Sequence, residues 1–203
     1  AEHSALRHWR NALKTLRDLP DVDELILSGG DPLTLSDARL AQLLAEAQRL
    51  PQLQRLRIHT RLPVVLPHRI TGALARLLSA SRLQTVLVIH ANHPREVTPE
   101  LGEALQKLAA GRVILLNQSV LLKSINDDAD TLAVLSDTLL RIGVMPYYLH
   151  LLDPVAGAAR FEVRLADAQR LLEELRLRLP GYLVPRMVRE VPGEPFKTPV
   201  SRL

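Results

Sequence analysis

The chain has 203 residues, of which 47% are hydrophobic and 24% are charged, so it is long enough to bury the core of a globular domain. The formal net charge is +4, but the basic residues are interspersed with acidic ones and only 3% of the residues are aromatic, so we do not expect nucleic-acid binding. No apolar run approaches about 20 residues and no signal-peptide core opens the chain, so we expect no membrane span and predict a cytoplasmic location.

Six short apolar segments are predicted to be β-strands, because most of them are continuous hydrophobic runs, as in strands buried on both faces. In chain order they are residues 24–29, 55–60, 84–90, 112–118, 145–152 and 182–188. Helical patterns are predicted at residues 36–50, 98–111, 128–143 and 165–179. The alternation of strand and helix predicts one α/β domain with a parallel sheet, either a doubly wound sheet or a barrel.

Polar residues follow every predicted strand. Because the carboxyl ends of parallel strands meet at one face of the fold, we expect a binding site there. The residues are Gly29, Gly30 and Asp31; His59, Thr60 and Arg61; His90, Asn92 and His93; Asn117, Gln118 and Ser119; Tyr147, Tyr148, His150 and Asp153; and Arg189 and Glu190.

Taken one at a time, these residues are less informative. His90 and His93 are three residues apart, which at a strand end does not aim both rings at one metal. Arg61 fits either a carboxylate partner or a bound phosphate, and Asp153 fits a turn. Lys197 is one of only four lysines in a chain dominated by arginine, and arginine cannot replace lysine as an imine-forming amine.

Seven stretches together carry a resemblance to a known family. They are SGGDPL (28–33), RIHTRLPVVLPHRIT (57–71), ANHPREV (91–97), LLNQSVLLKSIND (115–127), MPYYLHLLDPVAGAARF (145–161), GYLVPRMVRE (181–190) and PGEPFKTP (192–199). In their order along the chain they resemble the lysine 2,3-aminomutase family of radical S-adenosylmethionine enzymes. The tail GEPFKTP resembles the EpmB-like branch, which makes β-lysine for elongation factor P.

The resemblance implies an open, partial parallel β/α barrel of the radical S-adenosylmethionine type. It implies an isomerase that converts L-α-lysine to β-lysine by radical migration of the amino group from C2 to C3. Its cofactors would be pyridoxal 5′-phosphate, S-adenosyl-L-methionine and a [4Fe–4S] cluster. L-Lysine would be the small-molecule substrate, with a functional link to elongation factor P. A homo-oligomer stays open, and neither nucleic acid nor a membrane is expected as a partner.

The resemblance assigns five residues to S-adenosylmethionine. Gly29, Gly30 and Asp31 match the strand end that lies against the methionine part, where glycines let the backbone approach the ligand. His90 and Gln118 match positions that contact the nucleoside part.

The resemblance assigns four further residues to pyridoxal phosphate and substrate. Arg61 matches an arginine that binds the phosphate of pyridoxal phosphate, and Lys197 matches the catalytic lysine that forms the internal aldimine. Asp153 and Glu190 match acids that receive the distal amino group of the substrate. The lysine-catabolic mutases have an aspartate where this chain has Glu190, so the substrate geometry there differs.

The family binds its cluster through three cysteines in a CxxxCxxC loop, and this chain has no cysteine. We therefore assign no metal ligand within the sequence and expect no radical step from these residues alone. The simplest interpretation is a fragment that lacks the first strand and the cluster loop; a paralogue that has lost the cluster is the second. We expect residues 1–190 to form the partial barrel and residues 191–203 to form a C-terminal loop that carries Lys197.

Two other functions stay open. A catalytically inactive remnant would bind pyridoxal phosphate through Lys197 without radical chemistry. A non-radical barrel protein would instead bind a small phosphorylated ligand. Borohydride reduction after incubation with pyridoxal phosphate separates the two, because only the first would give an adduct at Lys197.

Overall fold

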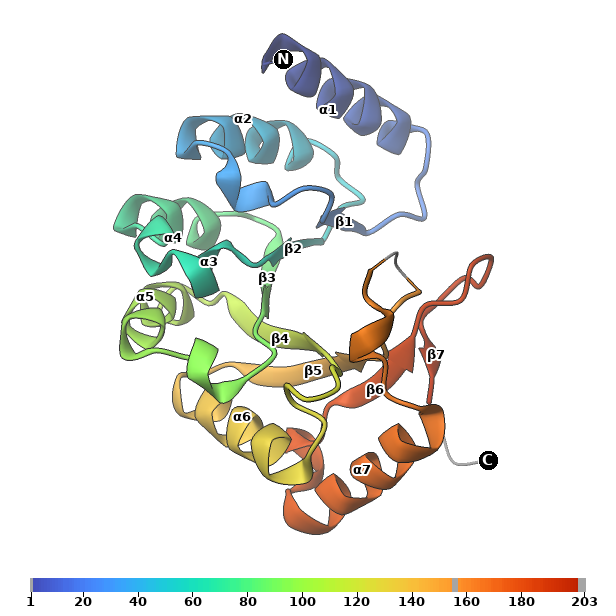
Figure 1. Ribbon diagram of the computed structural model, residues 1–203. Helices are drawn as coiled ribbons and strands as arrows, with labels where there is room; N and C mark the ends of the chain where they lie inside the picture. The colour runs from blue at the N-terminus through green and yellow to red at the C-terminus, as the bar shows by residue number, and fades with distance from the viewer. Residues whose placement is uncertain (1, 155–156, 201–203) are drawn as a thin grey trace.

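A computed structural model describes residues 2–154 and 157–200, and the described strands form one curled sheet (Figure 1). The strands follow one another across the sheet in the order of the sequence, and the first six are parallel. They are β1 (Glu24–Leu27), β2 (Arg55–Thr60), β3 (Gln84–His90), β4 (Ile114–Val120), β5 (Met145–His150), β6 (Arg186–Arg189) and β7 (Thr198–Pro199). This sequential order identifies the open half-barrel, because a doubly wound sheet would reverse its strand order.

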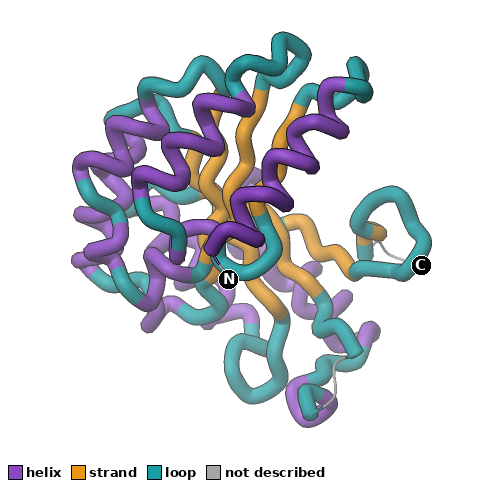
Figure 2. The backbone as a smooth tube through the Cα atoms, turned by 90° about the horizontal axis from the view of Figure 1, so that it is seen from above, coloured by secondary structure: helices purple, strands orange, loops and turns teal. Residues whose placement is uncertain are grey.

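The main helices lie along one side of the sheet, as seen from above in Figure 2. Right-handed crossovers between neighbouring parallel strands place successive helices on the same face. The helices are α1 (Glu2–Arg17), α2 (Asp37–Ala47), α3 (Leu62–Val65), α4 (Gly72–Ser79), α5 (Pro99–Ala109), α6 (Ala129–Arg141) and α7 (Leu165–Arg178). Short 3-10 helices are η1 (Pro32–Thr34), η2 (Pro67–Arg69), η3 (Pro94–Glu96), η4 (Ala159–Phe161) and η5 (Gly181–Leu183). No helix of the described part is long and apolar enough to cross a membrane.

Where a strand is regular, its residues alternate between the helices and the inner side of the curl. In β2, Leu56 and Ile58 are buried in the core beneath the helices, whereas Arg57 and His59 face the other way. A second group of core residues, which includes Leu149 and Met187, packs α6 and α7 against the later strands. We call the face away from the helices the inner face; its polar side chains are free to form a site.

Strand β5 carries one residue more than its neighbour β4. Asn117 lies opposite Pro146, and Gln118 lies opposite Tyr148, so Tyr147 is the extra residue of a β-bulge. The bulge brings the rings of Tyr147 and Tyr148 together, with centroids 3.8 Å apart. Adjacent residues of a regular strand would point to opposite faces.

Several local features differ from the sequence-based expectations. Helices α1, α3 and α4 occupy segments for which no helix was expected, and β6 begins at Arg186 rather than at residue 182. The tail, expected to be a loop, contains β7, which pairs antiparallel with β6. A strand this short gives no hydrophobic pattern, because its pairing depends on the register of β6. The division of the chain at residue 190 stays a prediction.

Candidate functional site

The carboxylate of Asp31 joins the ends of the first two strands. It accepts hydrogen bonds from the hydroxyl of Thr60 at 2.6 Å and from the backbone N–H groups of Arg61 at 2.7 Å and Leu62 at 3.0 Å. It also accepts one from the N–H of Leu33 at 3.0 Å. Asp31 therefore fixes the backbone that leaves β2, and with it the position from which the Arg61 side chain extends.

The two glycines before Asp31 leave open space at the end of β1. A Cβ atom built on Gly29 or Gly30 would have no neighbouring heavy atom within 4 Å. Gly30 also has a φ of +64°, a left-handed conformation that side chains disfavour. A ligand could approach the backbone closely at this point.

Arg61 is held in place by neighbouring residues but stays partly exposed. Its guanidinium donates to Glu96 at 2.9 Å, and half of its side-chain surface is exposed. The other carboxylate oxygen of Glu96 accepts from the N–H of Asn92 at 3.0 Å, and the Asn92 side chain accepts from the N–H of Val120 at 2.9 Å. This chain of contacts links the strand ends of β2, β3 and β4.

His90 and Gln118 face each other across β3 and β4. The distance from Gln118 Nε2 to His90 Nε2 is 3.0 Å, while Gln118 Oε1 is buried and has no partner among the described residues. The ring of His59 lies 5.9 Å from that of His90. Burial lowers the pKa of His59 to about 4 and also lowers the pKa of His90, although the nearby Asp31 carboxylate raises the latter.

Lys197 and Glu190 are brought together by the turn between β6 and β7. Arg189 lies opposite Thr198 in the antiparallel register, so the next residues outward are Glu190 and Lys197, which form an ion pair. The hydrogen bond from Lys197 lowers the pKa of Glu190. The Lys197 amine lies 5.9 Å from the centre of the Tyr148 ring, and both residues line a cavity of about 600 Å³.

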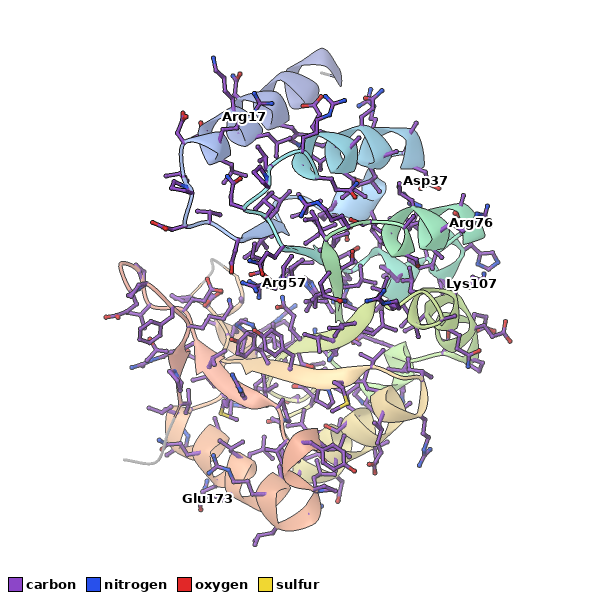
Figure 3. All side chains as sticks on the ribbon, turned by 180° about the vertical axis from the view of Figure 1, so that it is seen from behind. Arg17, Asp37, Arg57, Arg76, Lys107 and Glu173 are labelled. Carbon is purple, nitrogen blue, oxygen red and sulfur yellow. The ribbon has the colours of Figure 1, made fainter. Side chains whose placement is uncertain are left out.

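Several residues without a predicted role lie on the same inner face. Arg57, labelled in Figure 3, donates to Glu24 at 2.8 Å. Burial lowers the pKa of His150 to about 4, with Lys197 lowering it further, and raises the pKa of Tyr147 to about 12. The alternation of Arg55, Arg57 and His59 along β2 was a sequence pattern that could have identified this face. No sequence pattern indicated that Tyr147 and Tyr148 share one side of the sheet, because this depends on the bulge.

The structure brings together most of the predicted site residues in three groups. These are Asp31 with Arg61, His90 with Gln118, and Glu190 with Lys197. The electrostatic influence of Asp31 and Arg61 on His90, and of Lys197, Glu190 and His90 on His150, shows that the groups adjoin. Asp153 follows β5 in an exposed loop and makes no hydrogen bond or ion pair with another described residue.

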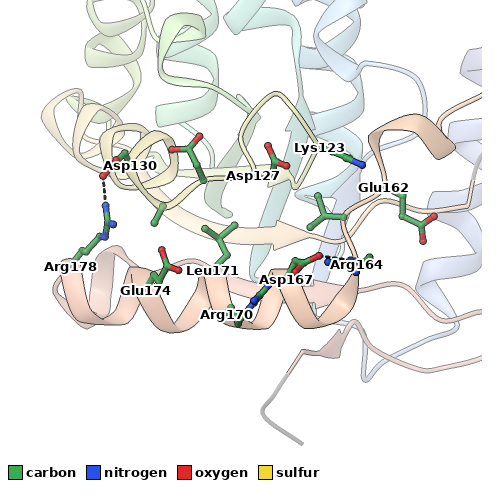
Figure 4. Close-up of a pocket in the computed structure, with 13 residues that line it drawn as sticks. Lys123, Asp127, Asp130, Glu162, Arg164, Asp167, Arg170, Leu171, Glu174 and Arg178 are labelled. Carbon is green, nitrogen blue, oxygen red and sulfur yellow. Dashed lines mark hydrogen bonds and ion pairs between the residues drawn. The ribbon is translucent and has the colours of Figure 1, made fainter.

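A separate cavity of about 650 Å³ lies between α6, α7 and the loop that follows β4 (Figure 4). Its charges largely neutralise one another: Arg178 pairs with Asp130, and Arg164 and Arg170 both pair with Asp167. We assign no ligand to it. Within the described ranges no three His, Cys, Asp or Glu side chains are arranged to hold a metal ion.

Comparison with known proteins gives close relatives of one kind. The chain is 50% identical to the L-lysine 2,3-aminomutase of Haemophilus influenzae over 192 residues, which are 95% of this chain and 57% of that protein. It is 50% identical to the L-lysine 2,3-aminomutase of Escherichia coli over 195 residues, 96% of this chain and 57% of that protein. No family model matches the chain.

A radical SAM methyltransferase from Sphaerobacter thermophilus has a similar fold, with a TM-score of 0.59 at 16% identity over 88% of this chain and 55% of that one. The chain thus spans little more than half the length of the curated relatives named above. In sequence and fold, the chain belongs to the lysine 2,3-aminomutase family of radical S-adenosylmethionine enzymes.

Proposed function

We propose that this chain supplies part of the active site of an L-lysine 2,3-aminomutase, an isomerase that converts L-α-lysine to β-lysine. One observation carries the proposal. The Lys197–Glu190 pair and the His90–Gln118 pair both belong to the inner face near the carboxyl ends of the strands, where parallel α/β folds bind their ligands. The product is expected to serve elongation factor P, an extension that rests on the resemblance of the tail.

The residues present fit pyridoxal 5′-phosphate. An aldehyde needs an accessible amine, and 29% of the Lys197 side-chain surface is exposed beside the cavity that it lines with Tyr148. A phosphate needs a cation, and Arg61 is half exposed at the end of β2. Lys197 would hold the cofactor covalently, and Arg61 would exchange Glu96 for the phosphate.

The residues present also fit S-adenosylmethionine. The open backbone at Gly29 and Gly30 offers a close approach to its amino-acid part, beside the carboxylate of Asp31. Gln118 is half-buried on the inner face, with its amide beside the rings of His90 and His59. His90 would orient Gln118 through their shared hydrogen bond.

The residues present do not fit a [4Fe–4S] cluster, because the 203 residues contain no cysteine. We derive no step through the cluster, and its thiolate ligands would have to come from outside this sequence. When bound, pyridoxal phosphate would hold the migrating amino group, and S-adenosylmethionine would supply the radical. The residues of this chain bind and orient these groups, and Glu190 and Asp153 would receive the distal ammonium of lysine.

Reduction with borohydride after incubation with pyridoxal phosphate tests the proposal. We expect a reduced adduct on the peptide that contains Lys197, detected by mass spectrometry, and its loss in Lys197→Ala. Lys123→Ala is the matched control, because Lys123 is exposed in the loop after β4 and should leave the adduct unchanged. No adduct at Lys197, or equal labelling of both lysines, would contradict the proposal.

A further inference from the structure

A buried polar atom without a hydrogen-bond partner lies near Lys197, on the inner face. In the described part of the chain, His150 Nε2, Thr198 Oγ1 and Gln118 Oε1 are buried and make no hydrogen bond. Arg57 Nε and Asp37 Oδ1 are also without a hydrogen bond, but their side chains have ion-pair partners in Glu24 and Arg69. Buried polar groups are almost always paired, so the unpaired His150 Nε2, which lies on the inner face near Lys197, indicates a missing ligand.

His150 is the most deeply buried of these side chains and is rigidly placed. Only 9% of its surface is exposed. Its backbone carbonyl accepts from the N–H of Leu121 at 2.8 Å, and the N–H of Leu151 that follows donates to Val188 at 2.8 Å. Both neighbouring strands therefore hold the backbone that carries the His150 ring on the inner face.

The surroundings of His150 describe the ligand that would satisfy it. Its ring lies edge-on to the Tyr148 ring, with centroids 5.6 Å apart, and the Lys197 amine lies 5.9 Å from the centre of the same tyrosine ring. A group joined to the Lys197 amine would therefore lie against the Tyr148 ring, with the His150 imidazole beside that ring. A flat heteroaromatic ring with polar atoms at its edge has this character.

The charge state of His150 points the same way. Burial is the main reason why its pKa falls to about 4, and the Lys197 cation lowers it further, while Glu190 opposes the shift. At neutral pH the imidazole is therefore uncharged. It can donate or accept one hydrogen bond at Nε2 without repelling Lys197.

We propose that His150 is a further cofactor-contact residue: its Nε2 hydrogen-bonds the heteroaromatic aldehyde held by Lys197, whose ring lies against Tyr148. The inference rests on the proposed function, since it takes Lys197 as the attachment point. The inference adds to that function a residue, His150, that orients the cofactor ring. A hydrophobic side chain of similar shape at this position would make no hydrogen bond to the cofactor ring.

Titration with pyridoxal phosphate, followed by its absorbance and by borohydride trapping, tests the role of His150. His150→Phe keeps a ring against Tyr148 but removes the nitrogen, and we expect the dissociation constant to rise about tenfold. His150→Gln can place its amide near the position of Nε2 and should stay within about threefold of the parent. The matched control is His68→Phe, because His68 is exposed in η2 and should have no effect.

A second readout keeps the test independent of folding defects. In the unaltered protein, the ¹⁵N resonance of His150 Nε2 should shift when pyridoxal phosphate binds, whereas that of His68 should not. Equal affinity of His150→Phe and parent, or an unmoved resonance while Lys197 is labelled, would overturn the role of His150 alone. Absence of labelling at Lys197 in the parent would overturn the proposed function as well.

Discussion

His59, His90 and His150 give the inner face hydrogen-bonding groups without net charge. Burial is the largest cause of the lowered pKa of all three, so each is uncharged at neutral pH. The charged residues nearby are paired, Arg61 with Glu96 and Lys197 with Glu190. The inner face thus combines uncharged hydrogen-bonding rings with paired ions.

The lowered histidine pKa values predict a loss of stability in acid. In the unfolded chain His59 is protonated below its ordinary pKa of 6.5, whereas in the folded chain it is protonated only below about pH 4. Between these values the unfolded state binds more protons, so the free energy of unfolding falls as the pH falls. His59→Gln removes this term and should flatten the profile by up to about 1.4 kcal/mol per pH unit. Arg57, His90 and Lys197, which also lower the pKa, and Gln118, which opposes them, remain in the variant.

Urea unfolding at several pH values between about 7 and 5 measures this difference. Parallel profiles for the parent and His59→Gln would show that His59 is not protected from protons in the folded state. His68→Gln is the control, because its exposed side chain should leave the slope unchanged.

The loop after β4 is held by one buried amide. Asn126 is fully buried; its Nδ2 donates to the carbonyl groups of Asn92 at 2.7 Å and Val120 at 2.9 Å, and its Oδ1 accepts from the N–H of Leu122 at 2.7 Å. Asn92 also supports Glu96 and hence Arg61. The position of Arg61 thus depends on a residue two strands away.

Asn126→Ala should destabilise the protein by about 2–4 kcal/mol, because it leaves three buried backbone groups without a hydrogen-bond partner. Asn11→Ala is the control, since Asn11 is exposed on α1 and its side chain makes no hydrogen bond in the described structure. The free energies of unfolding are compared by urea titration. A cost below about 1 kcal/mol would mean that water replaces the amide.

The whole sheet is continuous from β1 to β7, although its core residues fall into two groups. Trp9, the single tryptophan, packs against the first group, while α7 packs in the second. We expect one cooperative unfolding transition, with Trp9 fluorescence and far-ultraviolet circular dichroism changing together. Separate midpoints would show that the two ends of the sheet unfold independently.

The parallel strands, four of the helices (α2, α5, α6 and α7) and the polar strand ends were predictable from the sequence, because buried strands and amphipathic helices have local hydrophobic patterns. The short helices α3 and α4 after β2 were not predicted. The choice between an open barrel and a doubly wound sheet was not, since strand order is a long-range property. The family resemblance supplied it. The contacts of Glu96 and Asn126 could not be foreseen, because each depends on atoms that follow another strand.

The bulge at Tyr147 has a consequence for insertions and deletions in β5. Met145, before the bulge, lies opposite Leu116 and His150, after it, lies opposite Val120, and both partners belong to the inner face. An odd-numbered residue thus faces inward before Tyr147 and even-numbered residues do so after it. Deletion of Tyr147 alone would keep His150 on the inner face. Deletion of another residue between Met145 and His150, with the bulge retained, would turn His150 toward the helices.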